Sequence, residues 1–411
     1  MKILLVNKFH YQKGGSETYY FSLGELLKQQ GHQVIYFSMK DEQNVPDVNE
    51  RFFVEHVEFN GKQSPISLIK NAGHLLYSVE AFRKFKQYIQ IEKPDIIHLN
   101  IFQSQLSASI VDAAYQCGIP IVYTAHDLKS ICPNYQMLNH GQVCEKCRKG
   151  NYMHCFFSAC MKDSRSKSLL AAMEMYVYRL RKTYQKLDLI VTPSAFYKRK
   201  ITEAAITKAP IVHIPNFLPL NTQYTCKLGG DYFLYFGRLS REKGILTLIR
   251  AYAKTGRRFP LYIVGRGPME EQIRQLIKEK SLEEQVILLG FKQGKELTDI
   301  VEHARCICLP SEWYENGPYS IMEAMAAGKP VIVSSYGGLP EMVDEDQNGF
   351  IVQAGNTEEL KEALIKMEKE EILESFSIHA LKKAKQNFDA EKYASVMVRY
   401  YQKVIERRQK E

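Results

Sequence analysis

Residues 312–344 read EWYENGPYSIMEAMAAGKPVIVSSYGGLPEMVD, which indicates a loop, a helix and a buried strand in succession. Pro318 fits the first turn of the helix, where its missing N–H leaves no hydrogen bond unmade. Gly328 fits the position just after the last helical residue, and the proline that follows ends the helix before the apolar strand. Glu315 therefore falls in the loop before the helix, and Glu323 about a turn and a half inside it.

The start of this helix suits both an anion and hydroxyl groups. The backbone N–H groups of residues 317–320 point out of the helix end, where the helix dipole is positive. Glu323 stands among Ile321, Met322 and Met325, so its carboxylate needs hydrogen-bond donors, and a ribose diol supplies them. The alternative is a surface glutamate that the helix dipole favours. A phosphorylated sugar carries both an anion and hydroxyl groups.

The bulk composition limits the class of protein. The chain has 411 residues, more than one hydrophobic core usually supports, so we expect two domains. No apolar run reaches the ~18–20 residues of a transmembrane helix, and the first one is too short for a signal peptide. We therefore expect a cytoplasmic protein with reduced cysteines. The net charge of +9 suits phosphate-bearing ligands or an anionic membrane, and without a nucleic-acid-binding motif we expect no nucleic-acid partner.

Short β-branched runs alternate with helical stretches along the chain, which is typical of parallel sheets covered by helices on both faces. The expected strands are residues 2–7, 33–38, 95–100, 121–126, 189–194 and 211–215 in the first half, and 232–237, 261–265, 286–290, 306–310 and 330–334 in the second. The polar stretch 215–231 is interpreted as an interdomain linker. Residues 390–411 form an amphipathic helical pattern.

Two cations follow the first strand of the second half, in the run GRLSREKG of residues 237–244. Ligands of such sheets bind at the carboxyl ends of the strands. The guanidinium of Arg238 offers a planar fork and Lys243 a point charge, and together they suit a diphosphate. The alternative is solvated surface charge.

Two further motifs follow strands in the first half. Gly14 and Gly15 precede a helix start and would let backbone N–H groups approach a ligand, although a glycine turn is common there. The pair is not the dinucleotide pattern G-x-G-x-x-G, which disfavours a dehydrogenase. His126 ends its strand and could donate a hydrogen bond to a sugar hydroxyl; a capping or packing role is equally compatible with its position.

Five cysteines fall within one short segment. Cys144 and Cys147 form a C-x-x-C pair, and Cys132 and Cys155 flank it, which is a spacing typical of structural zinc sites. We therefore expect a structural zinc ion on these four thiolates. Reduced thiols packed in a loop are the alternative interpretation.

A helical stretch over residues 164–186 mixes apolar and basic side chains. Such a helix suits the surface of an anionic bilayer, as in a peripheral membrane protein. An amphipathic helix packed on its own domain, with a basic outer face, explains the pattern equally well.

These motifs together resemble those of the retaining GT-B glycosyltransferases of family 4, of the bacterial surface-polysaccharide type, over nearly the whole chain. The resemblance rests on Gly14-Gly15, Thr124-Ala125-His126, residues 237–244, the pair Glu315-x7-Glu323, and the GGLPE run of residues 337–341. It implies an α/β fold of the GT-B class, with two facing Rossmann-like, doubly wound domains and an interdomain cleft. The implied domains are 1–218 for the acceptor, with a cysteine-rich insertion at about 130–165, 219–387 for the nucleotide sugar, and a C-terminal helix 388–411 that packs back towards the first domain.

The resemblance also implies roles for single residues. Among the catalytic residues, Arg238 and Lys243 hold the diphosphate of the donor, Glu315 binds the hydroxyls of its sugar, and His126 contacts the sugar near the reacting carbon. No side chain is placed as a covalent nucleophile, so Glu315 is expected to position the sugar.

Donor binding is implied for a second set of residues. Glu323 would bind the ribose and Phe291 would flank the base. The backbone contacts to phosphate and sugar would come from Gly14, Gly15, Asn316, Gly317, Pro318 and Tyr319.

The implied reaction transfers a sugar from a UDP- or GDP-linked donor to an acceptor glycan with retained anomeric configuration. The expected acceptor is a lipid-linked saccharide of cell-surface polysaccharide synthesis, which places the protein in the cytoplasm or at the inner face of the membrane. No cofactor is required for catalysis. The alternative function is a non-catalytic nucleotide-sugar-binding scaffold of a glycan assembly complex, against which the intact Arg238, Lys243, Glu315 and Glu323 argue. A glycan phosphorylase is disfavoured because such enzymes are normally much longer.

Overall fold

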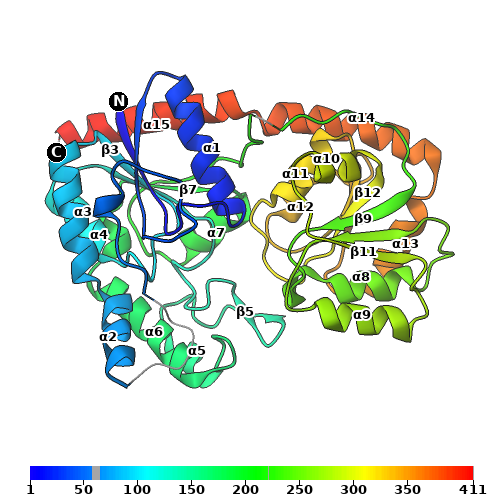
Figure 1. Cartoon of the computed structure of the whole chain (residues 1–411), viewed down its shortest axis with the longest axis horizontal. Helices are drawn as coiled ribbons and strands as arrows, with labels where there is room; N and C mark the ends of the chain where they lie inside the picture. Colours follow the sequence, from blue (N-terminus) through cyan, green and yellow to red (C-terminus); the bar gives the residue numbers. More distant parts are fainter. Residues whose placement is uncertain (58–64, 221, 411) are drawn as a thin grey trace. The chain divides into compact units, whose positions relative to one another are not determined.

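The computed structural model describes residues 1–57, 65–220 and 222–410, and its contacts divide the chain into two compact units (Figure 1). Unit 1 comprises Met1–His140, Cys144–Ile214 and Ala390–Glu411, and unit 2 comprises Gly141–Val143 and Pro215–Asp389. The division falls after Ile214, whereas we expected it after residue 218. Residue 221 of the expected linker and residue 411 of the expected C-terminal helix lie outside the described residues.

Unit 1 is built on one parallel sheet in the order β2-β1-β3-β4-β7-β8. Its strands are β1 (Lys2–Val6), β2 (Gln33–Phe37), β3 (Ile96–Leu99), β4 (Ile121–Thr124), β7 (Leu189–Thr192) and β8 (Ile211–His213). Its helices are α1 (Gly15–Gln29), η1 (Glu50–Phe52), α2 (Pro65–Leu76), α3 (Val79–Glu92), α4 (Ser109–Gln116), α5 (Met153–Phe157), α6 (Arg165–Leu180), η2 (Thr183–Lys186), α7 (Ala195–Glu203) and α15 (Ala390–Lys410). Two further short strands, which belong to neither six-stranded sheet, are β5 (Leu138–Asn139) and β6 (Gln142–Val143).

Helix α15, drawn red in Figure 1, lies against α1 and is tied to the unit 1 sheet by buried hydrogen bonds. The hydroxyl of Tyr401 lies 2.5 Å from Nδ1 of His98, and the hydroxyl of Tyr393 lies 2.6 Å from that of Tyr19. The other ring nitrogen of His98 lies 2.7 Å from Oγ1 of Thr124. Burial lowers the pKa of His98 to about 3, so the ring is neutral at pH 7 and offers one donor and one acceptor.

Unit 2 repeats the plan with a parallel sheet in the order β11-β10-β9-β12-β13-β14. Its strands are β9 (Tyr232–Phe236), β10 (Leu261–Val264), β11 (Val286–Gly290), β12 (Ala304–Leu309), β13 (Val331–Ser334) and β14 (Gly349–Val352). Its helices are η3 (Arg241–Lys243), α8 (Ile245–Tyr252), α9 (Glu270–Glu279), α10 (Gly294–Glu302), α11 (Tyr319–Ala326), α12 (Leu339–Met342), α13 (Thr357–Lys366) and α14 (Glu370–Asn387).

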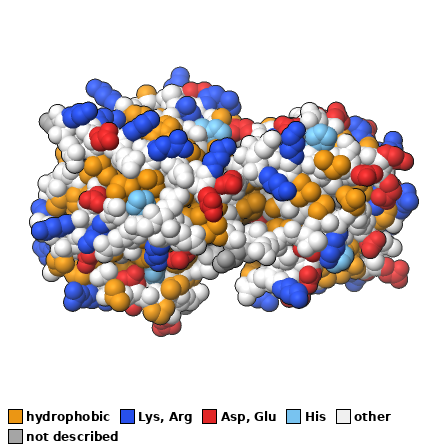
Figure 2. All heavy atoms as spheres, turned by 90° about the horizontal axis from the view of Figure 1, so that it is seen from above, with side chains coloured by type: hydrophobic (Ala, Val, Ile, Leu, Met, Phe, Trp, Pro, Cys, Tyr) orange, Lys and Arg blue, Asp and Glu red, His pale blue; other side chains and the backbone are white. Residues whose placement is uncertain are grey.

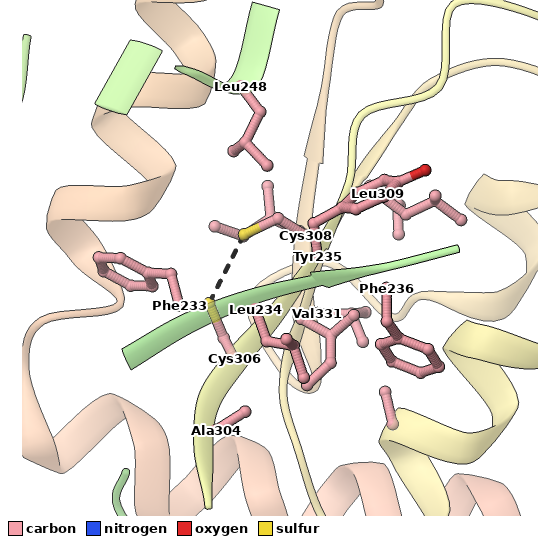
Figure 3. Packing of buried hydrophobic residues seen from close by; sticks show 14 of the residues in the cluster. Phe233, Leu234, Tyr235, Phe236, Leu248, Ala304, Cys306, Cys308, Leu309 and Val331 are labelled. Carbon is pink, nitrogen blue, oxygen red and sulfur yellow. Dashed lines mark hydrogen bonds between the residues drawn. The ribbon is translucent and has the colours of Figure 1, made fainter. Parts of the chain in front are cut away.

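Strand β9 is buried along its whole length in the middle of the unit 2 core. Figure 3 shows its side chains among Leu309 of β12 and Val331 of β13. The thiols of Cys306 and Cys308, 4.0 Å apart, lie in the same core, so these two cysteines pack as small apolar side chains. A strand covered on both faces is apolar at every position, which explains why the run YFLYF shows no alternation.

The prediction of one helix over residues 164–186 is wrong for its last six residues, 181–186. Helix α6 ends at Leu180, Lys182 has a left-handed φ of 53°, and a separate 3-10 turn follows. The side chains of Arg181 and Lys186 both form ion pairs with the buried Asp112 of α4. In one continuous helix these two cations would point about 140° apart, so they could not reach one carboxylate.

The turn around α11 agrees with the sequence pattern except at its first residue. Gly328 has a φ of 69° directly after the C-cap, which confirms its expected position. Pro318 is the N-cap, with an extended backbone, and the helix begins one residue later at Tyr319. Strand β14 was not expected, because its four residues follow a polar loop and carry no long apolar run.

Candidate functional site

The candidate residues of unit 2 gather at the carboxyl ends of neighbouring strands. The loop after β9 carries Arg238 and Lys243, and the loop after β12 carries Glu315. Gly244 has a φ of 69°, and a Cβ added there would lie 2.0 Å from the carbonyl oxygen of Pro310. The loop after β9 therefore rests directly on the end of β12, and only glycine permits this contact.

Lys243 and Glu315 form an ion pair at this edge. The ammonium of Lys243 donates to Oε1 of Glu315 at 2.6 Å, and the hydroxyl of Ser311 donates to the same oxygen at 2.7 Å. The Lys243 ammonium also lies 5.2 Å from the centre of the Trp313 ring, within the range of a cation–π contact. Glu315 is buried, with 4% of its surface exposed, so its carboxylate depends on these donors.

The loop after β13 holds the backbone of Glu315 in place. The N–H of Gly338 donates to the carbonyl oxygen of Glu315 at 2.7 Å. Gly337 has a φ of 69°, and a Cβ at this position would come within 2.2 Å of the same oxygen. The glycine pair of the GGLPE run therefore shapes the position of Glu315.

Glu323 lies half-buried on α11 and accepts a hydrogen bond from the hydroxyl of Tyr224. Burial raises the pKa of Glu323 to about 7, and the hydrogen bond from Tyr224 lowers it by a smaller amount. This carboxyl group is thus close to half protonated at neutral pH, and it can either donate to or accept from a ligand hydroxyl.

The other candidate residues of unit 2 either expose their side chains or are expected to contact a ligand through their backbone groups. Arg238 is exposed and forms no ion pair within the described part of the chain, while its carbonyl accepts from the Tyr235 hydroxyl at 2.8 Å. Phe291 is 54% exposed, with the guanidinium of Arg266 at 6.0 Å from its ring centre. The segment of Asn316, Gly317, Pro318 and Tyr319 is half-buried, and the Asn216 amide donates to the carbonyl of Gly317 at 3.2 Å.

In unit 1, His126 follows β4 and is fixed by Asn100. The Asn100 amide nitrogen donates to the carbonyl of Val6 at 3.2 Å, which turns its oxygen towards Nε2 of His126 at 2.9 Å. Because that oxygen can only accept, Nε2 carries the proton. Burial lowers the pKa of His126 to about 3, so the ring is neutral and Nδ1 is an acceptor. The expected contact of His126 with a sugar hydroxyl stays a prediction, and in this tautomer Nδ1 would be the acceptor in it.

The glycine pair of unit 1 stands at the start of α1. Gly14 is the N-cap and Gly15 the first helical residue. Behind them, the buried Glu17 accepts from the side-chain amide of Asn7 at 3.0 Å, and burial raises the pKa of Glu17. A carboxylate under the glycine turn was not expected from the sequence.

The cysteines expected to bind zinc lie around one cavity. Cys132, Cys144, Cys147 and Cys155 line it together with Cys160, whose Sγ lies 2.9 Å from that of Cys155. Burial raises the pKa of Cys132 and of Cys147 to about 12. Over residues 1–57, 65–220 and 222–410, no group of three or more His, Cys, Asp or Glu side chains has a metal-binding arrangement. The structure therefore does not support the zinc prediction.

Several contacts of the candidate residues were missed by sequence reasoning. Ser311 and Trp313 lie shortly before Glu315 in the sequence. They could have been predicted as candidate site residues, because a buried carboxylate needs nearby donors. Asn100, Asn7 and Tyr224 are far in sequence from the residues that they bind, and no local pattern marks them.

On the face shown in Figure 2, Lys and Arg side chains are interspersed with Asp and Glu side chains.

Comparison with known proteins covers both units. Residues 13–222 match the family described as "Glycosyltransferase Family 4", and residues 222–387 match "Glycosyl transferases group 1". An uncharacterized 42.6 kDa protein in the cps region of Klebsiella pneumoniae is 27% identical over 83% of this chain and 87% of its own length. The amylovoran biosynthesis glycosyltransferase AmsK of Erwinia amylovora is 32% identical over 33% of this chain and 35% of its own length. Several curated relatives are matched over only about a third of their length.

The solved structure of HepE from Anabaena in complex with UDP-glucose shares the fold. Its TM-score is 0.68 at 19% identity, and the match covers 98% of this chain and all of that one. Together with the two parallel sheets, this likeness confirms the predicted GT-B fold with two Rossmann-like domains.

Replacing Glu323 by Gln tests the raised pKa. The folded-state pKa of about 7 exceeds the ordinary 4.5, so between these values the folded chain keeps a proton that the unfolded chain loses. The wild-type protein therefore loses stability as the pH rises through this window. The free energy of unfolding of Glu323→Gln, taken relative to that of wild type, should therefore increase by about 2–3 kcal/mol as the pH is raised from about 4.5 to about 8.

Urea unfolding at both pH values measures this gain, with Glu374→Gln on the exposed face of α14 as the control. If the difference in free energy of unfolding between Glu323→Gln and wild type did not change with pH, as expected for the control, the raised pKa of Glu323 would be contradicted.

Proposed function

Because the chain belongs to glycosyltransferase family 4, we propose that it transfers a sugar from a nucleoside-diphosphate sugar to an acceptor glycan with retention of the anomeric configuration. The observation that carries this proposal is the Lys243–Glu315 ion pair at the strand ends of unit 2, with the exposed Arg238 in the same loop as Lys243. Cations at this edge suit a diphosphate, and a fixed carboxylate suits sugar hydroxyls.

The proposed chemistry places the main catalytic effect on the leaving group. The bond between the anomeric carbon and the diphosphate breaks, the acceptor oxygen bonds to that carbon on the same face, and the hydroxyl proton passes to the departing phosphate. Negative charge grows on the phosphate in the transition state, and cations already aimed at it lower the barrier. Lys243 uses one of its three N–H donors on Glu315, which leaves two for phosphate oxygens.

Glu315 acts in this proposal as a positioning residue. Oε1 already accepts from Lys243 and Ser311, and the backbone is held by Gly338, so the carboxylate has one fixed orientation. Its remaining lone pairs would accept from hydroxyls of the donor sugar. A carboxylate tied to a lysine in this way is a poor nucleophile, which favours a same-face reaction over a covalent intermediate.

The other assignments concern binding. Glu323, with its pKa near neutrality, would bind the ribose diol, and the exposed ring of Phe291 would flank the base. His126 would accept a hydrogen bond from a sugar hydroxyl through Nδ1. Backbone groups at Gly14, Gly15 and residues 316–319 would contact phosphate and sugar.

Two similarities support the choice of donor and acceptor. The HepE structure holds UDP-glucose, which favours a uridine nucleotide here, with GDP as the alternative. The Klebsiella relative is described as part of a cps region and AmsK as an amylovoran biosynthesis enzyme, which favours a cell-surface polysaccharide as the product. We take the acceptor to be a lipid-linked saccharide of that pathway.

A lipid-linked acceptor requires contact with a membrane surface. No helix within the described residues is long and apolar enough to cross a bilayer. Helices α5 and α6 expose Phe157 (70%), Leu180 (81%) and Met173 (44%), and the basic Arg165 and Lys167 are exposed on α6 as well. Exposed apolar side chains beside cations suit an anionic bilayer surface.

Replacing Leu180 by Ser should therefore weaken sedimentation of the protein with phosphatidylglycerol vesicles severalfold, because each buried apolar side chain adds to membrane affinity. Ile378→Ser on α14, where Ile378 is 59% exposed, is the matched control. Equal vesicle binding by both variants and wild type would count against α6 as the membrane contact.

Replacing Lys243 by Ala should weaken the binding of UDP or GDP about ten- to hundredfold, because charge-assisted hydrogen bonds to phosphate are lost. Glu315→Ala should mainly lower kcat, by about a hundredfold or more, since it positions the reacting sugar. Calorimetry with each nucleotide and turnover assays with common donors measure these effects, with the exposed Lys280→Ala as the control.

Unchanged affinity of Lys243→Ala for both nucleotides would refute the phosphate assignment. If wild type and Glu315→Ala were equally inert with every common donor, the scaffold function would replace the enzymatic one.

A further inference from the structure

Besides the cysteine-lined cavity, unit 1 contains a polar cavity. None of the residues proposed to bind the donor or the acceptor lines it. It lies among the cysteine-rich insertion, the C-terminal ends of α6 and α7, and the 3-10 turn that follows α6. Its volume is about 190 Å³, roughly ten times what one water molecule needs, so it can hold a group of several heavy atoms. The chemistry of its wall is carried by Ser130, Arg148, Lys149, Arg179, Lys182 and Thr183.

Two hydroxyl groups in this wall are buried without hydrogen-bond partners. Ser130 is 1% exposed and Thr183 is fully buried. Neither Oγ of Ser130 nor Oγ1 of Thr183 has a partner among the described residues. Buried hydroxyls are normally satisfied, because leaving them unpaired reduces stability. Two such groups lining one cavity point to a ligand that supplies their partners.

The basic side chains around the cavity carry uncompensated charge. Lys149 and Lys182 are exposed and form no ion pair within residues 1–57, 65–220 and 222–410. Among the described residues, Arg179 donates to the carbonyl of Gly150 alone, at 3.2 Å. In contrast, Arg148 is neutralised by ion pairs with Glu145 and Glu203.

The helix ends oppose this positive charge only in part. The C-termini of α6 and α7 each carry a partial charge of about −0.5, roughly −1 in total. The three full charges of Lys149, Arg179 and Lys182 outweigh that sum. The cavity thus combines a positive rim with hydroxyl groups in its wall.

We propose that this cavity binds a phosphate group. A tetrahedral oxyanion has enough acceptors for the two hydroxyls and for the ammonium and guanidinium groups of the rim. The phosphate could belong to a soluble anion or to a membrane lipid, and the recognition chemistry is the same for both. The site is independent of the diphosphate site assigned to unit 2.

The first test is calorimetric titration of the full chain with inorganic phosphate, in a Lys243→Ala background that disables the unit 2 cation. The double variant Lys149→Gln/Lys182→Gln should bind phosphate at least about tenfold more weakly, since two charge-assisted contacts are lost. The control is Lys146→Gln/Lys162→Gln, which removes the same charge from exposed lysines outside the cavity; Lys162 shares the φ of 53° of Lys182. The control should bind as the parent does.

A second measurement examines the hydroxyls. Ser130→Ala and Thr183→Val should each weaken phosphate binding severalfold, because each removes one hydrogen bond. In the absence of phosphate, both variants should melt at or above the temperature of the parent, because the unpaired hydroxyl is gone. A role in packing alone would leave phosphate affinity unchanged.

The source of the phosphate is distinguished with phosphatidylcholine vesicles that do or do not carry a polyprenyl phosphate. Sedimentation that needs the polyprenyl phosphate, and that inorganic phosphate competes away, identifies a lipid ligand. Binding of inorganic phosphate alone identifies a soluble anion. The proposal is overturned if the parent binds neither, or if the Lys149/Lys182 variant binds as tightly as its control.

Discussion

The ion pair between Lys243 and Glu315 joins loops that follow adjacent strands of unit 2. Lys243 follows β9 and Glu315 follows β12, while Gly337 and Gly338 follow β13, and these strands are neighbours in the order β9-β12-β13. A parallel sheet brings the carboxyl ends of its strands to one edge, so residues distant in sequence meet there. The close backbone contacts that complete the arrangement require glycine at positions 244 and 337.

Burying this ion pair does little for stability by itself. Taking both charges out of water costs about as much as their attraction returns, and apolar side chains of similar size would serve folding as well. Under the proposed function, the pair would hold a carboxylate and an ammonium in fixed positions for the donor. In unit 1, the orientation of His126 is also fixed by its surroundings: burial keeps its ring neutral, and the contact with Asn100 sets its tautomer.

The sequence predicted the sheets well and their irregular parts poorly. All eleven expected strands are present. Strands covered on both faces are short apolar runs, and the turn residues on either side mark their ends clearly. Strand β14 was missed because it has no such run. The break at Lys182 was missed because no glycine or proline marks it; the tertiary pairing of Arg181 and Lys186 with Asp112 imposes it.

Lys243 and Glu315, both predicted from the sequence, form an ion pair in the structure, but the chemistry of the candidate residues was less predictable. The spacing of Glu315 and Glu323 around a helix start could be read directly, but the raised pKa of Glu323 depends on burial and on Tyr224, which no local pattern indicates. Cysteine spacing predicted a zinc site, yet spacing does not determine the geometry of the thiols. The most direct test of the account is a crystal structure of the chain with uridine diphosphate. The account predicts the diphosphate against Lys243 and Arg238 and the ribose at Glu323; a diphosphate bound away from these residues would contradict it.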